Sequence, residues 1–264
     1  MNLKTWKAFV AARDHYKEYI DDLTRQLPAL QPLQQELVNR RTGPAYTVET
    51  PIVYNLALDE VTQKDDIKLI LTADNPGRRE QAAENRRYLV GPSGKIADRF
   101  FREHPELGID FRQNVLILNK TPIHTPRTIE LGELCRLGGP ALTAAVTGSQ
   151  KIMAELLLEF HKALAPVPVW IIGYSEMKKG GIFETYTETL RELYAPKNTT
   201  KAPAKHTAPL MHSDSVLWDQ LFFYRHFSMN QFTIDLRQQT NPKESLPDAL
   251  ERIGRAYRKR VLEW

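Results

Sequence analysis

Polar side chains follow two short apolar runs, and a histidine stands further along the chain. Asn75 comes soon after the run 67–71, Asn119 directly after the run 115–118, and His212 precedes a serine-rich stretch. A side-chain amide both donates and accepts hydrogen bonds, so it can read the polar edge of a ligand. These residue types at the ends of strands therefore indicate a binding site for a polar ligand.

A phosphate-binding P-loop is the first alternative, because Gly94-Lys95 follows a glycine-containing loop. That motif requires a glycine five positions before Gly94 and a serine or threonine after the lysine. Leu89 and Ile96 occupy those two positions. The sequence therefore excludes a P-loop here.

The elements that position these residues alternate along the chain. Apolar runs at 67–71, 115–118 and 167–172 predict strands, and 207–211 predicts a fourth. Apolar residues at helical spacing, together with capping signals, predict helices at 6–27, 32–39, 150–164 and 179–194, and a last one that Ser245 caps with Pro247 and Asp248 in its first turn.

Strands that alternate with helices predict a three-layer α/β/α fold with a central, mostly parallel four-stranded sheet. Right-handed crossovers place the carboxyl ends of all its strands at one edge. Ligands of such sheets bind at that edge. The polar residues that follow the strands are therefore expected to meet in one concave site.

Composition narrows the class of protein. The chain has 264 residues, 42% of them hydrophobic and 26% charged, which is typical of a water-soluble globular protein. No apolar run reaches bilayer length, and the N-terminus lacks the apolar core of a secretory signal. The single cysteine, Cys135, excludes an internal disulfide and a cysteine-ligated cluster. We expect a cytoplasmic protein without a metal, a cofactor or a membrane partner.

Charge permits nucleic-acid binding without establishing it. The formal net charge is +4, from 36 Lys and Arg against 32 Asp and Glu. Two arginine pairs, Arg78-Arg79 and Arg86-Arg87, cluster around a glycine-bearing loop. Clustered arginines can contact phosphates, although a solvated helix face is the usual explanation for any single pair.

Five motifs in order resemble those of the uracil-DNA glycosylase superfamily, over roughly residues 67 to 230. The resemblance implies a glycosylase-like domain over 51–264 and leaves 1–50 as a helical extension packed on it. The motifs are Asn-Pro-Gly at 75–77, Leu-Val-Gly-Pro-Ser-Gly at 89–94, Leu-Ile-Leu-Asn at 116–119, the strand 169–175 with Lys-Lys-Gly at 178–180, and His-Ser-Asp-Ser at 212–215 with Phe-Phe-Tyr-Arg-His-Phe-Ser at 222–228.

The resemblance implies an enzyme that hydrolyses the N-glycosidic bond of uracil, or of a related damaged or mismatched base, in base-excision repair. It implies that His212 donates to the uracil O2 and that Asn75 holds the attacking water. Asn119 is similar to the asparagine that reads the pyrimidine edge. The same resemblance makes Tyr88, Leu89, Asp74 and Gly77 substrate-binding residues, with Tyr88 expected to stack on the flipped base.

DNA is the implied partner, single- or double-stranded, bound by a monomer. A side chain usually fills the space that a flipped base leaves, and Val216 or Leu217 is the expected wedge. Hydroxyl and guanidinium groups are expected on the phosphates, from Ser93, Ser175, Ser213, Ser215, Arg78 and Arg79. Arg225 and His226 are expected to be structural or to contact the DNA backbone.

The sequence departs from the family where an amide, Asn75, replaces a carboxylate and where prolines are missing beside His212. Two other interpretations therefore stay open. One is a DNA-binding protein of the same fold with little or no hydrolytic activity. The other is an unrelated α/β protein that binds nucleotides or proteins.

Overall fold

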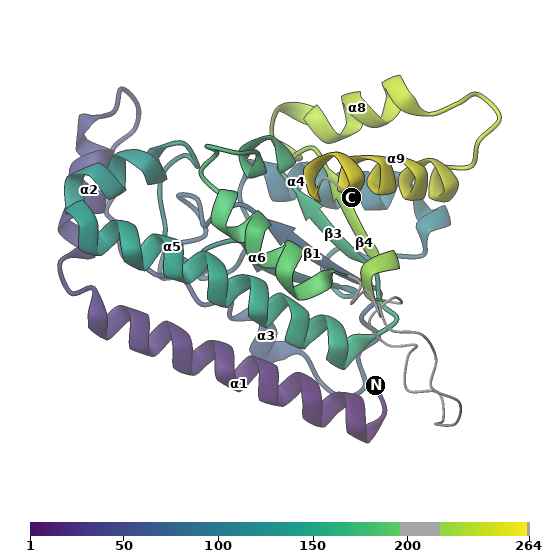
Figure 1. The fold of residues 1–264 in the computed structure, drawn as a ribbon, viewed down its shortest axis with the longest axis horizontal. Coiled ribbons are helices and arrows are strands. Elements are labelled where there is room, and N and C mark those ends of the chain that lie inside the picture. The colour runs from purple at the N-terminus through teal and green to yellow at the C-terminus, as the bar shows by residue number, and fades with distance from the viewer. Residues whose placement is uncertain (196–216, 263–264) are drawn as a thin grey trace, which may run out of the picture.

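The sheet has four parallel strands in the order β2-β1-β3-β4. The computed structural model describes residues 1–195 and 217–262. The strands are β1 (Leu69–Ala73), β2 (Val115–Asn119), β3 (Val169–Ile172) and β4 (Leu221–Tyr224). Helices cover both faces of the sheet (Figure 1). The predicted α/β fold with a four-stranded central sheet is confirmed.

The fourth strand differs from the prediction. The stretch 207–211 lies outside the described residues. The strand that pairs with β3 is instead β4, with Val169 opposite Leu221 and Ile172 opposite Tyr224. All four residues of β4 are buried, as an apolar run between two helical layers requires.

One face of the sheet packs against α5 (Glu130–Leu164) and α6 (Glu184–Tyr194). Outside α5 lie α1 (Leu3–Gln26) and α2 (Leu30–Arg40), as Figure 1 shows. The ring of Phe9 on α1 is 5.5 Å from that of Phe160 on α5. The first two helices thus bury their apolar stripes on the domain.

The other face packs against α4 (Pro92–Glu103), α8 (Gln231–Gln239) and α9 (Leu246–Leu262). Aromatic rings fill this layer: Trp170 on β3 stacks 5.6 Å from Phe101 and lies 4.9 Å from Tyr224. The remaining short elements are α3 (Ala57–Glu60), η1 (Pro105–Leu107), η2 (Tyr174–Met177) and η3 (Ser228–Asn230).

Helix boundaries differ from the prediction where glycines intervene. The helix predicted at 150–164 is the second part of α5, which begins at Glu130 and kinks at Gly139, where φ is +70°. The helix predicted from residue 179 begins at Glu184, because Gly180 has a positive φ and opens a turn. The helix α4 was not predicted, and α8 was predicted only as a helical segment without bounds ahead of the last helix.

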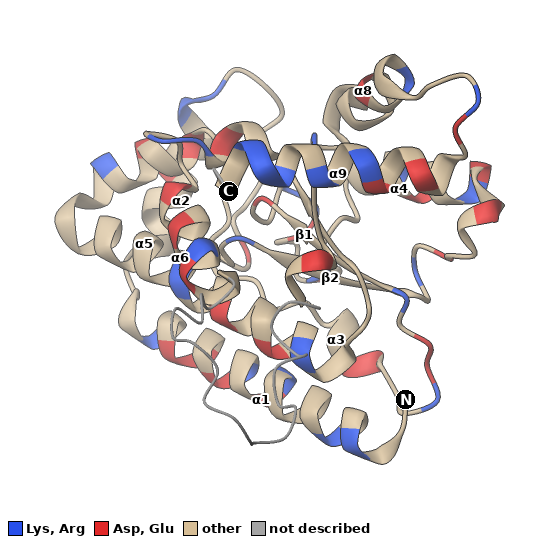
Figure 2. Ribbon diagram, turned by 45° about the vertical axis from the view of Figure 1, so that its right-hand side comes forward, with Lys and Arg blue, Asp and Glu red and all other residues tan. Residues whose placement is uncertain are grey.

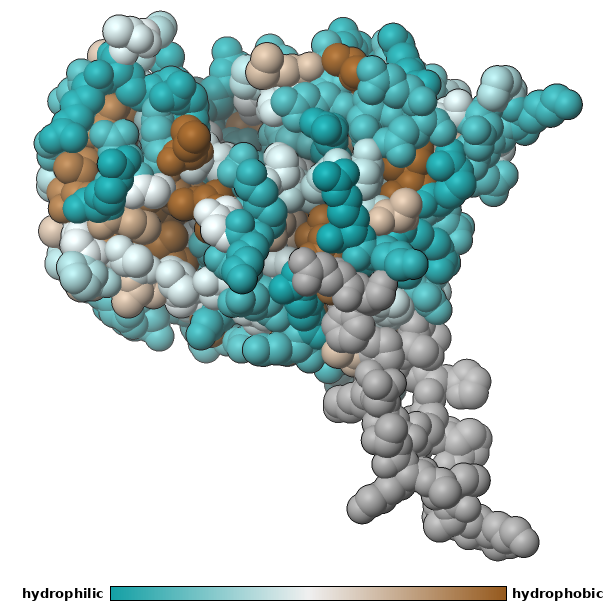
Figure 3. Space-filling model, turned by 45° about the horizontal axis from the view of Figure 1, so that its top comes forward, coloured by the Kyte–Doolittle hydropathy of each residue, from teal (hydrophilic) through white to brown (hydrophobic). Residues whose placement is uncertain are grey.

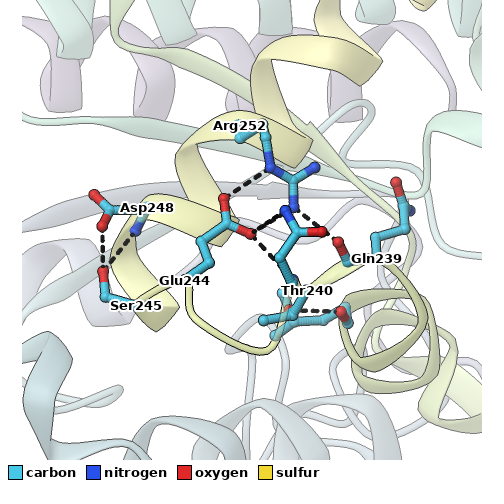
Figure 4. Close-up of polar contacts among 8 residues, drawn as sticks. Gln239, Thr240, Glu244, Ser245, Asp248 and Arg252 are labelled. Carbon is cyan, nitrogen blue, oxygen red and sulfur yellow. Dashed lines mark hydrogen bonds and ion pairs between the residues drawn. The ribbon is translucent and has the colours of Figure 1, made fainter.

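The start of α9 matches its sequence signals (Figure 4). Ser245 Oγ accepts the Asp248 N–H at 3.3 Å and donates to the Asp248 carboxylate at 2.6 Å. Just before it, Glu244 receives two hydrogen bonds of 2.7 Å from Arg252, which lowers the pKa of Glu244 to about 2. These contacts fix the turn between α8 and α9.

Charge and hydropathy are distributed without a single dominant patch in the views drawn. Lys and Arg are interspersed with Asp and Glu along α1 and α6, whereas the C-terminal part of α9 carries mainly basic side chains (Figure 2). Apolar residues reach the surface in Figure 3 as separate patches on a largely hydrophilic face. Within residues 1–195 and 217–262, no helix is long and apolar enough to cross a membrane.

Candidate active site

A cavity of about 760 Å³ lies at the carboxyl edge of the sheet. Its walls come from the segments that follow three strands: Asp74 and Asn75 after β1, Ser175 after β3, and His226 after β4. Of the residues predicted for the site, it brings together Asp74, Asn75, Gly77, Arg78, Arg79, Leu89, Ser93 and Ser175.

A buried ion pair joins the carboxyl ends of β1 and β2 next to the cavity. Lys120, the residue after β2, is fully buried, and its Nζ lies 2.6 Å from Asp74 Oδ1 and 2.6 Å from the Ile172 carbonyl oxygen. Burial lowers the pKa of Lys120, and the neighbouring carboxylate opposes that shift. Thr128 Oγ1 lies 3.4 Å from the other carboxylate oxygen of Asp74. Asp74 is thus held in one orientation.

Gly173 is required for this arrangement. Its φ is +81°, and a Cβ atom there would lie 2.4 Å from Asp74 Oδ1. We expect Gly173→Ala to lower the free energy of unfolding by roughly 1–2 kcal/mol from backbone strain alone. Gly148→Ala is the matched control, because its Cβ meets no atom within 4 Å in α5 and alanine favours a helix by about 1 kcal/mol. Urea denaturation measures both, and equal stabilities would contradict the expectation.

His226 faces the cavity as a neutral hydrogen-bond donor. Its Nδ1 accepts the Ser228 N–H at 3.0 Å and lies 2.8 Å from Ser228 Oγ. A backbone N–H can only donate, so the proton of the neutral ring is on Nε2. Burial lowers the pKa of His226, with Asp74 opposing and Lys120 adding to the shift. The ring therefore stays neutral near pH 7 and presents an N–H group.

Asn75 presents its carbonyl oxygen. Its Nδ2 donates to Thr125 Oγ1 at 2.8 Å and to the Ile123 carbonyl oxygen at 3.3 Å. No side chain or N–H group in the described part of the chain donates to its Oδ1 in return. An amide held in this way can orient a water molecule through its oxygen.

Glu80 is a second carboxyl group in the cavity wall. Its Oε2 accepts the Gly77 N–H at 2.8 Å, which closes the turn after Asn75. Burial raises the pKa of Glu80 to about 7, against the opposing effect of its hydrogen bonds and Arg112. A carboxyl group that titrates near neutral pH can take or give a proton under physiological conditions.

The loop above the cavity turns sharply at Leu89, whose φ is +51°. A Cβ atom on Gly94 would lie 1.4 Å from the Leu89 carbonyl oxygen, so only glycine fits there. Arg112 Nη2 donates to the same carbonyl oxygen at 2.7 Å. The glycine of the predicted 89–94 motif therefore serves a close backbone approach that positions Leu89 and Ser93 at the cavity.

The structure places Tyr88 in the core, so the predicted stacking role is corrected. Its side chain is 1% exposed, and its hydroxyl lies 2.6 Å from the Val53 carbonyl oxygen and 2.5 Å from the Tyr16 hydroxyl. Asn119 is also buried and does not line the cavity. Its Nδ2 has no hydrogen-bond partner among the described residues.

Leu217 cannot be the expected wedge at this edge. It precedes β4, at the opposite end of the strand from His226, and is 5% exposed in the core. The other predictions in this segment, His212, Ser213, Ser215 and Val216, lie outside the described residues.

Three residues of the cavity region were not predicted as functional: Lys120, Glu80 and His226. Lys120 directly follows the strand that ends in Asn119. Its position after a strand could have indicated that it lies at the carboxyl edge of the sheet. His226 was assigned a structural or backbone-contacting role, and only the pairing of β4 with β3 brings it to the site. Glu80 follows Gly77 by three residues, a spacing typical of a side chain that caps its own turn.

Comparisons with known proteins add no assignment. No protein-family model matches the chain, and a search of curated proteins finds no significant match. Among the residues that the structure describes, no group of three or more His, Cys, Asp or Glu side chains could hold a metal ion.

Proposed function

We propose that the protein is a DNA glycosylase that hydrolyses the N-glycosidic bond of uracil or of a related damaged or mismatched base. One observation carries the proposal: a neutral histidine N–H, an amide oxygen and an ion-paired carboxylate border one cavity at the carboxyl edge of the sheet. Those groups match the charges that form when a base leaves a sugar.

In the proposed reaction the C1′–N bond breaks and its electron pair leaves with the base. His226 Nε2–H stabilises the negative charge that develops on the base oxygen. His226 thus takes the role that the family resemblance gave to His212. The Asp74 carboxylate, near Asn75, stabilises the positive charge on the sugar.

Water completes the reaction at C1′. The Asn75 amide oxygen orients the water molecule. As the C1′–O bond forms, a proton of that water passes to the Asp74 carboxylate. General-base help of this kind is worth about 10²–10⁴-fold. Asp74 thus supplies the carboxylate that the Asn75 position lacks.

Asn119, which the family resemblance makes the reader of the pyrimidine edge, is 1% exposed and does not line the cavity, so the proposal does not depend on it. The cavity volume of about 760 Å³ lies within the usual range for small-molecule sites.

A single-turnover assay tests the proposal. Excess protein is mixed with an end-labelled oligonucleotide that carries one uracil, and free uracil is quantified. We expect release from the uracil oligonucleotide and none from the same sequence with cytosine. If no base is released while salt-dependent DNA binding persists, the protein binds DNA without hydrolysing it. If neither occurs, the proposal fails entirely.

Met229 is the proposed wedge for duplex DNA. Its side chain is 81% exposed at the rim of the cavity, in η3, three residues after His226. We expect Met229→Ala to slow release from a duplex about tenfold or more and to leave release from a single strand unchanged, because only the duplex must be opened. Ile234→Ala, at an exposed position on α8, is the control. Equal effects on both substrates would contradict a wedge.

A further inference from the structure

A second cavity, of about 600 Å³, adjoins the candidate active site. The two cavities share Arg78 and Arg79. The opposite wall comes from the end of the N-terminal extension, at Tyr46, Thr47 and Glu49. We call this second cavity the side groove. The extension thus reaches the site as well as packing on α5.

The segment 46–50 is tied to the turn after β1. Gln81 Oε1 accepts the N–H groups of Glu49 and Thr50, at 2.6 and 3.2 Å. Its Nε2 donates to the Thr47 carbonyl oxygen at 3.2 Å. Gln81 is 2% exposed, so these hydrogen bonds are shielded from water. The segment 46–50 is therefore held rigidly against the turn after β1.

Tyr46 is anchored separately. His124 Nδ1 lies 2.8 Å from the Pro76 carbonyl oxygen, which can only accept, so this nitrogen carries the proton. His124 Nε2 then accepts from the Tyr46 hydroxyl at 3.0 Å. Burial lowers the pKa of His124 to about 4, so this arrangement persists at neutral pH. The tyrosine ring is thereby fixed beside the groove.

The Arg78 guanidinium lies over the ring of Tyr46, 5.0 Å from its centre. Arg78 and Arg79 are both exposed, and neither has a carboxylate within ion-pair distance in the described parts of the chain. The groove also contains two carboxylates. That of Glu49 accepts the Ala83 N–H at 2.6 Å, and that of Glu84 lies 3.4 Å from Asn85 Nδ2. Two arginines and two glutamates leave little net charge, so stacking has to supply most of the binding energy.

We infer that the side groove binds the nucleotide next to the target in an unpaired DNA strand. Its base stacks on the Tyr46–Arg78 pair, and its phosphate lies on Arg79. Aromatic rings and guanidinium planes are the usual platforms for unpaired bases, and they accept every base. A base inside a duplex is stacked on its neighbours and has no free face to offer, so the groove favours single strands. This inference rests on the proposed function and adds a substrate preference to it.

The test is a double-mutant cycle in which one change is made in the protein and the other in the substrate. Single-stranded oligonucleotides carry one uracil, with or without an abasic sugar at the neighbouring position on either side. Wild type, Tyr46→Ala and Arg78→Ala are measured for dissociation constant and for single-turnover rate. One lost base stack is typically worth about 5- to 150-fold in affinity. We expect the wild-type protein to lose that much affinity for one of the two abasic substrates. Tyr46→Ala should bind that abasic substrate as weakly as it binds the oligonucleotide without an abasic sugar.

Controls separate stacking from folding. Tyr46→Phe keeps the ring and should retain the abasic effect, whereas Arg102→Ala changes an exposed arginine that lines neither cavity and should behave as wild type. If the abasic substrates and Tyr46→Ala have independent effects, or if neither abasic sugar weakens binding, the inference is overturned. Because the cycle is measured in affinity as well as in rate, it is decided even if no base is released, which would overturn only the proposed function.

Discussion

Replacing His226 with alanine is expected to slow single-turnover release of uracil by about 10²–10³-fold, the usual cost of one donor to a developing oxyanion. The Ser228 contacts place the proton on Nε2, and alanine removes that donor without removing a charge. The His15→Ala variant is the control, because His15 lies half-exposed on α1 and pairs with Glu159, away from the cavity.

The same experiment separates His226 from His212. If His226→Ala retains the wild-type rate while His212→Ala loses it, the role belongs to His212. The pH profile adds a second measurement. Burial lowers the pKa of His226, so the neutral donor is lost only when the pH falls below the usual histidine range. A rate that fell already at pH 6–7 through this histidine would contradict a neutral donor.

Lys120→Met is expected to destabilise the fold by about 3–5 kcal/mol, because it leaves the Asp74 carboxylate at the sheet edge without its partner. The side chain of Lys120 is 0% exposed and that of Asp74 is 12% exposed. Urea denaturation measures the change. The double variant Lys120→Met with Asp74→Asn should recover part of the loss, since no unpaired charge then remains.

A surface ion pair provides the matched control. Lys17 Nζ lies 2.8 Å from Asp59 Oδ1, with 43% and 31% of the two side chains exposed. Solvent screens such a pair, so Lys17→Met should cost about 0–1 kcal/mol. If Lys120→Met costs no more than Lys17→Met, the buried pair does not hold the strand ends together. Loss of base release in the stable double variant would show that the Asp74–Lys120 pair acts in catalysis and not only in folding.

Much of the fold could be predicted from local patterns. The run that forms β2, at 115–118, was predicted to within one residue, because a strand buried on both faces is apolar throughout. Ser245 and Asp248 were correctly predicted at the start of α9, because capping involves residues within one turn of each other. Asn75 was placed at the carboxyl edge of the sheet, because the topology follows from the alternation of strands and helices.

By itself, the sequence determined that strands alternate with helices, and hence that Asp74 and Asn75 end a strand at a ligand-binding edge. Only the tertiary structure decided which partners complete the site. Tyr88 is in the core because Tyr16, 72 residues earlier, meets its hydroxyl. His226 lines the cavity because β4 pairs with β3. Lys120 is buried at the same sheet edge because its Nζ forms an ion pair with Asp74 Oδ1, 2.6 Å away. Periodicity reports the contacts of neighbours along the chain, whereas a site is made of contacts between residues far apart in it.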